Sequence, residues 1–302
     1  MMDNTVSYHD NEVVDILANM LRQERDTYRR NDYLAKVVKF EDGIIDSCWR
    51  QRMIEWMYGV IDHCNLRRES VVVATHFLDL AASRGLVRSR RDFQLISMTS
   101  LMLSIKLNDS TSVKLDSMVR LGKGLFSETD VLKMEMALLK VMNWQVHPPT
   151  TLCFIRQLLR FLPAETSPVA RYLVVELTRF IAEVSVCLYP FIKYDSSITA
   201  IAGIVISLER VDESTFPHVL REQFLNHIFD IMDIDNNSEC MRQAVQELRS
   251  SFDNNVNLDE LMRGLDQQCK LVTNSPESKP KDVEMQYDEP HSPRDVSSNN
   301  LR

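Results

Sequence analysis

The sequence predicts an all-α protein, and three observations support this fold class. Apolar residues recur at three- and four-residue spacing along nearly the whole chain, and only 7 glycines occur in 302 residues. Alternating β-branched runs bounded by turn residues are scarce. The pair Pro148-Pro149 divides helical patterns of similar number and length. Because two prolines cannot continue a helix, we expect two tandem five-helix bundles.

A leading amphipathic helix is expected over residues 11–25, followed by a polar connection that ends near Phe40. Helical periodicity then predicts ten further helices, at residues 44–64, 69–83, 91–107, 113–121 and 128–143, and at residues 154–162, 170–188, 198–208, 219–232 and 239–252. Residues 95–105 are apolar or small on every side, so we expect them to form the central helix of the first bundle.

A last amphipathic piece covers residues 258–271. The residues from Thr273 onward are rich in Ser, Pro, Asn, Asp and Glu, a composition typical of disorder. The expected domains are an N-terminal segment, two helical bundles, and a final helix with its tail, at residues 1–43, 44–147, 148–256 and 257–302.

Composition excludes several classes of function. The net charge is -8 and no long Lys/Arg block is present, which argues against nucleic acid or an anionic membrane as the main partner. No apolar segment is long enough to span a membrane, and the six cysteines are far apart. We therefore expect a soluble protein in a reduced intracellular compartment.

Motifs of catalysis are also missing. The seven histidines show no metal-ligand spacing, and His76 reads as a satisfied core residue. The sequence Gly122-Lys-Gly124 lacks the further residues of a dinucleotide or phosphate loop, so we interpret it as a turn after a helix. We expect no enzymatic activity, no cofactor and no metal.

One carboxylate stands out. Ser127 and Asp130 predict the start of a helix, and Glu135 then falls within its apolar arc. The other members of that arc are Val131, Leu132, Met134, Leu138, Leu139 and Met142. Because an unpaired buried carboxylate costs several kcal/mol, Glu135 requires a partner in this chain or in another protein.

Five motifs follow one another along the chain: Trp49-Arg-Gln-Arg-Met-Ile-Glu-Trp-Met57, Val71-Val-Val-Ala-Thr-His-Phe-Leu-Asp79, Leu101-Met-Leu-Ser-Ile-Lys106, Leu132-Lys-Met-Glu-Met-Ala-Leu-Leu-Lys-Val-Met-Asn-Trp144 and Tyr194-Asp-Ser-Ser-Ile-Thr-Ala200. This is the order in which similar motifs occur in cyclins, and the chain resembles a cyclin from the leading helix to about residue 250. The leading helix and Glu55-Trp56-Met57 lean toward the D-type, G1-phase cyclins.

The resemblance implies a regulatory subunit, without catalysis of its own, that activates a cyclin-dependent kinase and controls the cell cycle. Lys106 and Glu135 fall where cyclins hold the regulatory helix of the kinase, with Leu107, Leu132 and Leu139 beside them. An internal pair of Lys106 with Glu135 is the alternative interpretation. The resemblance also implies residence in the nucleus or cytoplasm.

The substrate-docking patch of the family is altered. Its tryptophan and glutamine are present as Trp56 and Gln94, and Met53 is counted as a further member of the patch. Its methionine is replaced by Trp49, its isoleucine by Arg52 and its glutamate by Gly59. Loss of the glutamate and gain of an arginine should weaken the docking of basic Arg-x-Leu substrates.

Two other functions keep the helical fold. A transcription-associated cyclin, or an adaptor like the general transcription factors, would share these motifs, and a scaffold without a kinase would make Lys106 and Glu135 coincidental. In the tail, Ser275 and Ser292 each precede a proline, so a proline-directed kinase could phosphorylate them.

Overall fold

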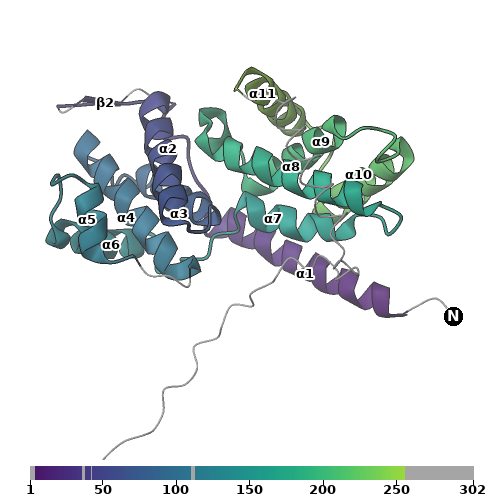
Figure 1. The fold of residues 1–302 in the computed structure, drawn as a ribbon, viewed down its shortest axis with the longest axis horizontal. Coiled ribbons are helices and arrows are strands. Elements are labelled where there is room, and N and C mark those ends of the chain that lie inside the picture. The colour runs from purple at the N-terminus through teal and green to yellow at the C-terminus, as the bar shows by residue number, and fades with distance from the viewer. Residues whose placement is uncertain (1–3, 36–37, 42, 110–112, 256–302) are drawn as a thin grey trace, which may run out of the picture. The chain divides into compact units, whose positions relative to one another are not determined.

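The fold is described by a computed structural model for residues 4–35, 38–41, 43–109 and 113–255. These residues contain eleven α-helices, two 3-10 helices and one two-stranded sheet (Figure 1). The all-α prediction is thus confirmed. The expected piece at residues 258–271 and the tail with Ser275 and Ser292 lie outside the described residues.

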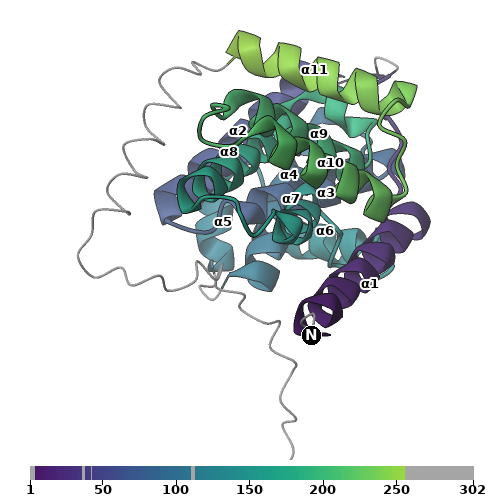
Figure 2. The same ribbon diagram turned by 90° about the vertical axis from the view of Figure 1, so that its right-hand side faces the viewer.

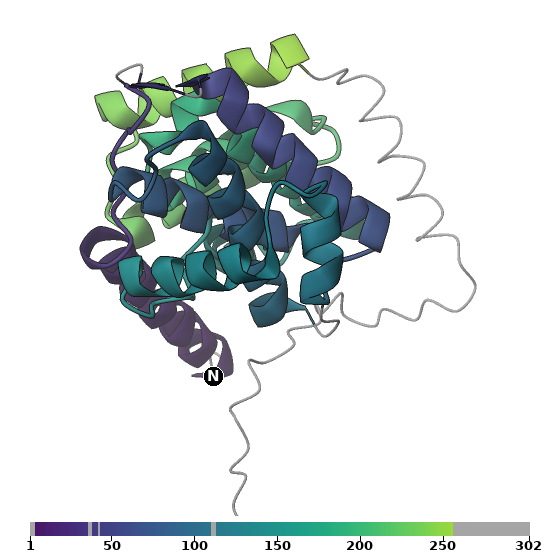
Figure 3. The same ribbon diagram turned by 90° about the vertical axis from the view of Figure 1, so that its left-hand side faces the viewer.

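The first helices agree closely with the sequence periodicity. They are α1 (Asn4–Asp26), α2 (Ser47–Cys64), α3 (Glu69–Ser83), α4 (Arg90–Asn108), α5 (Leu115–Leu121) and α6 (Glu128–Val141). Figure 3 views this set from the side of α5 and α6. α1 begins seven residues earlier than expected.

A short antiparallel hairpin between α1 and α2 was not expected. Strands β1 (Val38–Phe40) and β2 (Gly43–Ile45) pair in the register Lys39 with Ile44. The predicted helix start at residue 44 is therefore wrong. Gly43 has a φ of +135°, and α2 begins only after Asp46, whose side chain accepts a hydrogen bond from the Trp49 N–H at 2.8 Å.

Capping side chains set the first residues of α4 and α6, the two helices that carry the candidate site described below. The Ser89 hydroxyl accepts from the Asp92 N–H at the start of α4. At α6, Ser127 and Asp130 form a reciprocal capping box, as the sequence predicts.

The core of the N-terminal set is built around two helices rather than one. α4 is buried from Leu95 to Ile105, as expected for a central helix, but α3 is buried without interruption from Ser70 to Ala82. The complete burial of α3 was not predicted from the sequence. The largest side chains of this core include Ile54, Met57, Phe77, Leu78, Leu80 and Phe93.

The second set follows a non-helical segment that contains Pro148 and Pro149. Its elements are α7 (Thr151–Leu158), η1 (Leu159–Phe161), α8 (Pro168–Cys187), η2 (Tyr189–Ile192), α9 (Ser196–Arg210), α10 (His218–Met232) and α11 (Glu239–Asn255). α9 packs against α7, α8 and α11, and Figure 2 shows α11 lying across this set. Its core includes the fully buried Phe154, Phe216, Phe224 and Phe252.

α1 packs against the second set although it precedes the first in sequence. It contacts α7 and α10, and Val13 and Leu17 of α1 are buried. The segment that follows α1 also contacts the second set, because the Tyr189 hydroxyl of η2 donates a hydrogen bond to Asp32 at 2.9 Å. The N-terminal segment therefore ties the two helical sets together.

Candidate functional site

The last turn of α4 and the middle of α6 carry an ion pair. Lys106 Nζ lies 2.7 Å from Glu135 Oε1, and the side chains are 40% and 16% exposed. Val131, Leu138 and Met142 are buried and hold α6 against α4. In the free chain, Lys106 supplies the partner that Glu135 was expected to need, as in the alternative interpretation.

The outer face of α6 is apolar and exposed. Leu132 is 50% exposed and Met136 is 44% exposed, while Leu139 is half-buried. With Glu135 they occupy positions separated by three, four and seven residues, which form one helical face. We name these four residues the α6 stripe. Within the predicted apolar arc, Leu132 is thus exposed, whereas Val131 and Leu138 are buried.

Trp144 extends this surface beyond the end of α6. It is 61% exposed, and its N–H donates to the Leu139 carbonyl at 2.9 Å. Asn143 and Trp144 both have positive φ, at 51° and 62°, so the chain leaves the helix through two left-handed residues. Leu107, at the end of α4, is half-buried.

Met136 and Trp144 are residues that sequence reasoning missed as site candidates. Met136 is not a member of the predicted apolar arc, and it is exposed in the structure. An exposed apolar residue on this helix was not considered as an indication of a binding surface. Its spacing of four residues from Leu132 places it on the same helical face as Leu132.

The residues expected in the altered docking patch lie on α2 and α4. Trp49, Met53 and Trp56 are half-buried and pack on the N-terminal core, whereas Arg52 is exposed. Gln94 is half-buried on α4. A feature absent from the sequence prediction is Arg90, whose guanidinium carbon lies 3.4 Å from the centre of the Trp49 ring.

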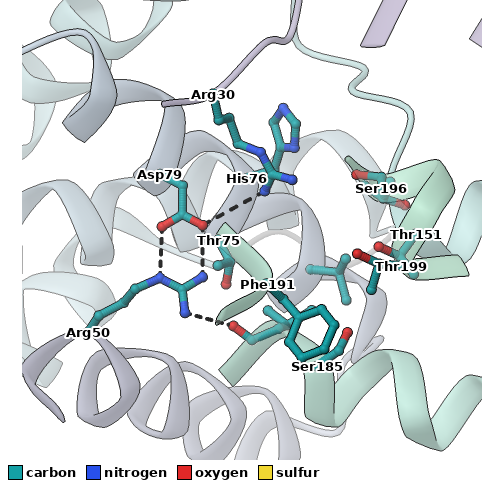
Figure 4. A pocket seen from close by; sticks show the side chains of 13 residues that line it. Arg30, Arg50, Thr75, His76, Asp79, Thr151, Ser185, Phe191, Ser196 and Thr199 are labelled. Atoms are coloured by element: carbon teal, nitrogen blue, oxygen red, sulfur yellow. Dashed lines mark hydrogen bonds and ion pairs between the residues drawn. The ribbon is translucent and has the colours of Figure 1, made fainter. Parts of the chain in front are cut away.

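A buried ion pair lies where the two helical sets meet (Figure 4). Arg50 of α2 donates from Nε and Nη2 to the two oxygens of Asp79 on α3, at 2.9 and 2.8 Å. The side chains are 3% and 0% exposed. Arg50 also donates to the Val186 carbonyl of α8 at 2.9 Å, and the Tyr33 hydroxyl donates to Asp79 at 2.8 Å. Because Arg50 and Tyr33 satisfy the Asp79 carboxylate, this charged residue of α3 can be buried.

His76 lies near the same junction. It lines a polar cavity of about 30 Å³, together with Thr75, Arg30 and residues of the second set (Figure 4). Burial, Arg30 and Arg84 lower its pKa well below the usual value. The ring is buried as expected, but the expectation of a satisfied residue fails at Nε2, which has no hydrogen-bond partner among the described residues.

Glu24 of α1 caps the start of α9. Its two carboxylate oxygens accept from the Ser197 N–H at 3.1 Å and from the Ser197 hydroxyl at 2.6 Å. Burial raises the pKa of Glu24 from 4.5 to about 7. This contact fixes α1 to the second set by a titratable group.

Within the described part of the chain, no cluster of His, Cys, Asp or Glu is arranged to hold a metal ion. A helix that is both long and apolar enough to cross a membrane is likewise absent from those residues. The five cysteines there are all free thiols.

Comparisons with known proteins agree with this architecture. The family model for the cyclin N-terminal domain matches residues 15–147, and the model for the cyclin C-terminal domain matches residues 149–257. Cyclin-A1-4 of Oryza sativa subsp. japonica is 28% identical over 164 residues, 54% of this chain and 45% of that protein. Cyclin-A1 of Homo sapiens is 30% identical over 173 residues, 57% of this chain and 36% of that protein.

Among solved structures, a viral cyclin from herpesvirus saimiri superimposes with a TM-score of 0.55 at 13% identity, covering 77% of this chain and 97% of the viral chain. The chain spans less than half the length of the two A-type relatives. The expected similarity to D-type cyclins is not seen in these relatives, which are A-type cyclins. Two family models that together cover residues 15–147 and 149–257 show that the chain belongs to the cyclin family.

Proposed function

We propose that the chain is a regulatory subunit that binds and activates a cyclin-dependent kinase, has no catalysis of its own, and controls progression of the cell cycle. One observation carries this proposal: the Lys106–Glu135 pair lies beside exposed Leu132 and Met136. An ion pair within an exposed apolar surface offers both charge and apolar area to a partner.

The chemistry of the pair suits the recognition of backbone N–H and C=O groups that a partner helix leaves unsatisfied. A lysine ammonium has three donors, so Lys106 can keep one bond to Glu135 and still donate to backbone carbonyls of a partner. A carboxylate accepts several bonds, so Glu135 can take backbone N–H groups through its second oxygen. The internal pair keeps the two side chains side by side at the surface.

Binding of this kind would activate a kinase by moving its regulatory helix. That helix carries the glutamate that pairs with the β3 lysine of the kinase, and activity requires this pair. A cyclin that holds the helix in the active position shifts the kinase population toward the active state. The apolar α6 stripe would supply most of the buried area.

The test is a reconstitution with purified components. The full chain is mixed with a panel of cyclin-dependent kinase subunits, and binding and phosphorylation of a peptide substrate are measured together. We expect at least one kinase to bind and to gain activity that its β3-lysine variant lacks. Binding without activation would favour an adaptor instead, and absence of binding across the panel would overturn the proposal.

A further inference from the structure

The polar cavity at the junction is lined by two buried side chains that the protein does not satisfy. Thr75 and His76 of α3 lie on one side of it and Thr199 of α9 on the other (Figure 4). Thr75 is 2% exposed and His76 is 5% exposed. Thr75 Oγ1 and His76 Nε2 have no hydrogen-bond partner among the described residues. Because a buried polar atom without a partner loses the hydrogen bonds it made to water in the unfolded chain, both atoms call for a ligand in the cavity.

The ligand must suit a histidine that is neutral. Burial and the nearby Arg30 and Arg84 lower the pKa of His76 well below the usual value, so the ring carries no charge at neutral pH. In a neutral ring, Nε2 either donates or accepts a hydrogen bond, depending on the tautomer, and the Thr75 hydroxyl can do both. Water donates and accepts, so it satisfies either tautomer and the hydroxyl as well.

The second set offers further partners to a water in this cavity. Ser185 of α8 and Thr199 of α9 both line it. The Ser185 hydroxyl donates to the Ala182 carbonyl at 2.7 Å, and the Thr199 hydroxyl donates to the Asp195 carbonyl at 3.0 Å. Because each hydroxyl has already used its proton, its oxygen is left to accept a hydrogen bond from water.

The charged groups of the lining are engaged by the protein itself. Arg50 donates to both oxygens of Asp79 and to the Val186 carbonyl. Arg30 Nη1 lies 3.8 Å from Asp79 Oδ2, and Arg30 Nη2 donates to the Tyr194 carbonyl at 3.4 Å. Both guanidinium groups therefore have a carboxylate beside them, and the site does not require an anion.

We propose that this cavity is a water-binding site, in which one or two ordered water molecules satisfy His76 Nε2 and Thr75 Oγ1 and donate to Ser185 or Thr199. One water needs roughly 10 to 15 Å³ of such a cavity and two to four polar partners, and the cavity measures about 30 Å³. The water would form a hydrogen-bonded link between α3 and the second set, beside the Arg50–Asp79 pair.

A crystal structure of the full chain tests the occupant directly. Crystals grown with bromide in place of chloride distinguish water from an anion, because bromide scatters anomalously. We expect an ordered water within about 3.2 Å of His76 Nε2 and no anomalous peak in the cavity. An anomalous peak there would overturn the proposal in favour of an anion site, and a cavity without ordered density would overturn it as well.

Stability gives a second test, whose sign depends on the water. Thr75→Val keeps the shape of the side chain but removes one partner of the water, so the unfolding equilibrium constant should rise roughly threefold to tenfold. If no water is bound, the same change removes an unsatisfied buried hydroxyl and leaves the protein as stable as the parent or more stable. Urea unfolding of the full chain measures the difference.

Thr99→Val is the matched control. Thr99 of α4 is 0% exposed and its hydroxyl also has no partner among the described residues, but it does not line this cavity. We expect Thr99→Val to be at least as stable as the parent. A Thr75→Val variant that loses no stability, or no more than Thr99→Val, would overturn the proposal.

Discussion

Lys106 Nζ and Glu135 Oε1 lie 2.7 Å apart and join the last turn of α4 to the middle of α6. Both side chains retain contact with solvent, and such pairs contribute only about 0 to 1 kcal/mol to folding. The pair therefore contributes little to the stability of the fold. Its position beside the exposed part of the α6 stripe is the reason that we propose a role for it in kinase recognition.

The first prediction concerns this pair. Lys106→Ala and Glu135→Ala should weaken kinase binding by about 2 to 5 kcal/mol, because each leaves its partner unpaired in a desolvated interface. The melting temperature should hardly change, since the pair is partly exposed. Titration calorimetry and thermal melting test both statements. The matched control is Arg120→Ala, which breaks the exposed Asp116–Arg120 pair of α5; parent-like binding by both site variants would refute the assignment.

A second prediction concerns the apolar part of the α6 stripe. Leu132→Ser and Met136→Ser should each weaken kinase binding at least tenfold, because their exposed area is lost from the interface. Exposed positions contribute little to folding, so stability should stay within about 0.5 kcal/mol of the parent. Val219→Ser, at a 74% exposed position of α10, is the control for loss of a surface apolar group. Equal losses in all three variants would argue against a specific surface.

The third prediction concerns the buried pair at the junction. Asp79→Asn leaves Arg50 buried without its counter-charge and should cost about 3 to 5 kcal/mol of unfolding free energy. Asp116→Asn, on the surface, should cost less than about 0.5 kcal/mol. Urea unfolding of the full chain measures both. If Asp79→Asn is as stable as Asp116→Asn, the pair does not hold the junction.

The fourth prediction is a pH dependence due to Glu24. Burial raises its pKa from 4.5 to about 7, so between these values the folded protein keeps a proton that the unfolded chain has lost. Stability from this group is complete below pH 4.5 and is lost as the pH rises through 7. Glu24→Gln cannot ionise, so its stability relative to the parent should rise by about 2 to 3 kcal/mol from pH 4 to pH 8.

Comparing the parent with Glu24→Gln cancels the contributions of the other titrating groups to stability, because both proteins contain them. His76, whose pKa is lowered, makes both chains less stable as the pH falls below its usual value of 6.5. Chemical unfolding at several pH values gives the difference directly. A constant difference between parent and variant from pH 4 to pH 8 would show that Glu24 titrates normally.

The fifth prediction concerns the C-terminal tail. Deletion of residues 273–302 should lengthen the cellular half-life without weakening kinase activation, and Ser275→Ala with Ser292→Ala should reproduce part of this effect. Phosphates at these serines would supply a charged motif for an arginine-lined reader. Cycloheximide chase measures the half-life. No change, in cells where the full chain turns over quickly, would leave the tail without this regulatory role.

The helices could be predicted because each one carries its own periodic signal. Capping residues such as Ser127 also fixed helix starts to within a residue or two. The β1–β2 hairpin could not be predicted in this way. Its strands have three residues each, and a sheet of that size depends on tertiary packing, here on the buried Ile45 and on Arg90 against Gly43.

The site was only partly predictable. Glu135 could be identified because a carboxylate within an apolar arc requires a partner, and Lys106 is that partner in the structure. Asp79 obeys the same rule within the buried α3 but was not considered, and its partner Arg50 lies 29 residues away. The stacking of Arg90 on Trp49 depends on how α2 packs against α4, for which the sequence carries no local signal.

The contact between Glu24 and Ser197 spans 173 residues, and this sets an order of events during synthesis. At roughly 5–20 residues per second, about 10 to 35 s separate the two residues as they leave the ribosome. Until α7, α9 and α10 are made, α1 has no surface on which to bury Val13 and Leu17, and most of the stability of a helix in a protein comes from packing of its apolar face. α1 is therefore made well before the helices on which it docks, and its apolar face stays open to chaperones during that interval.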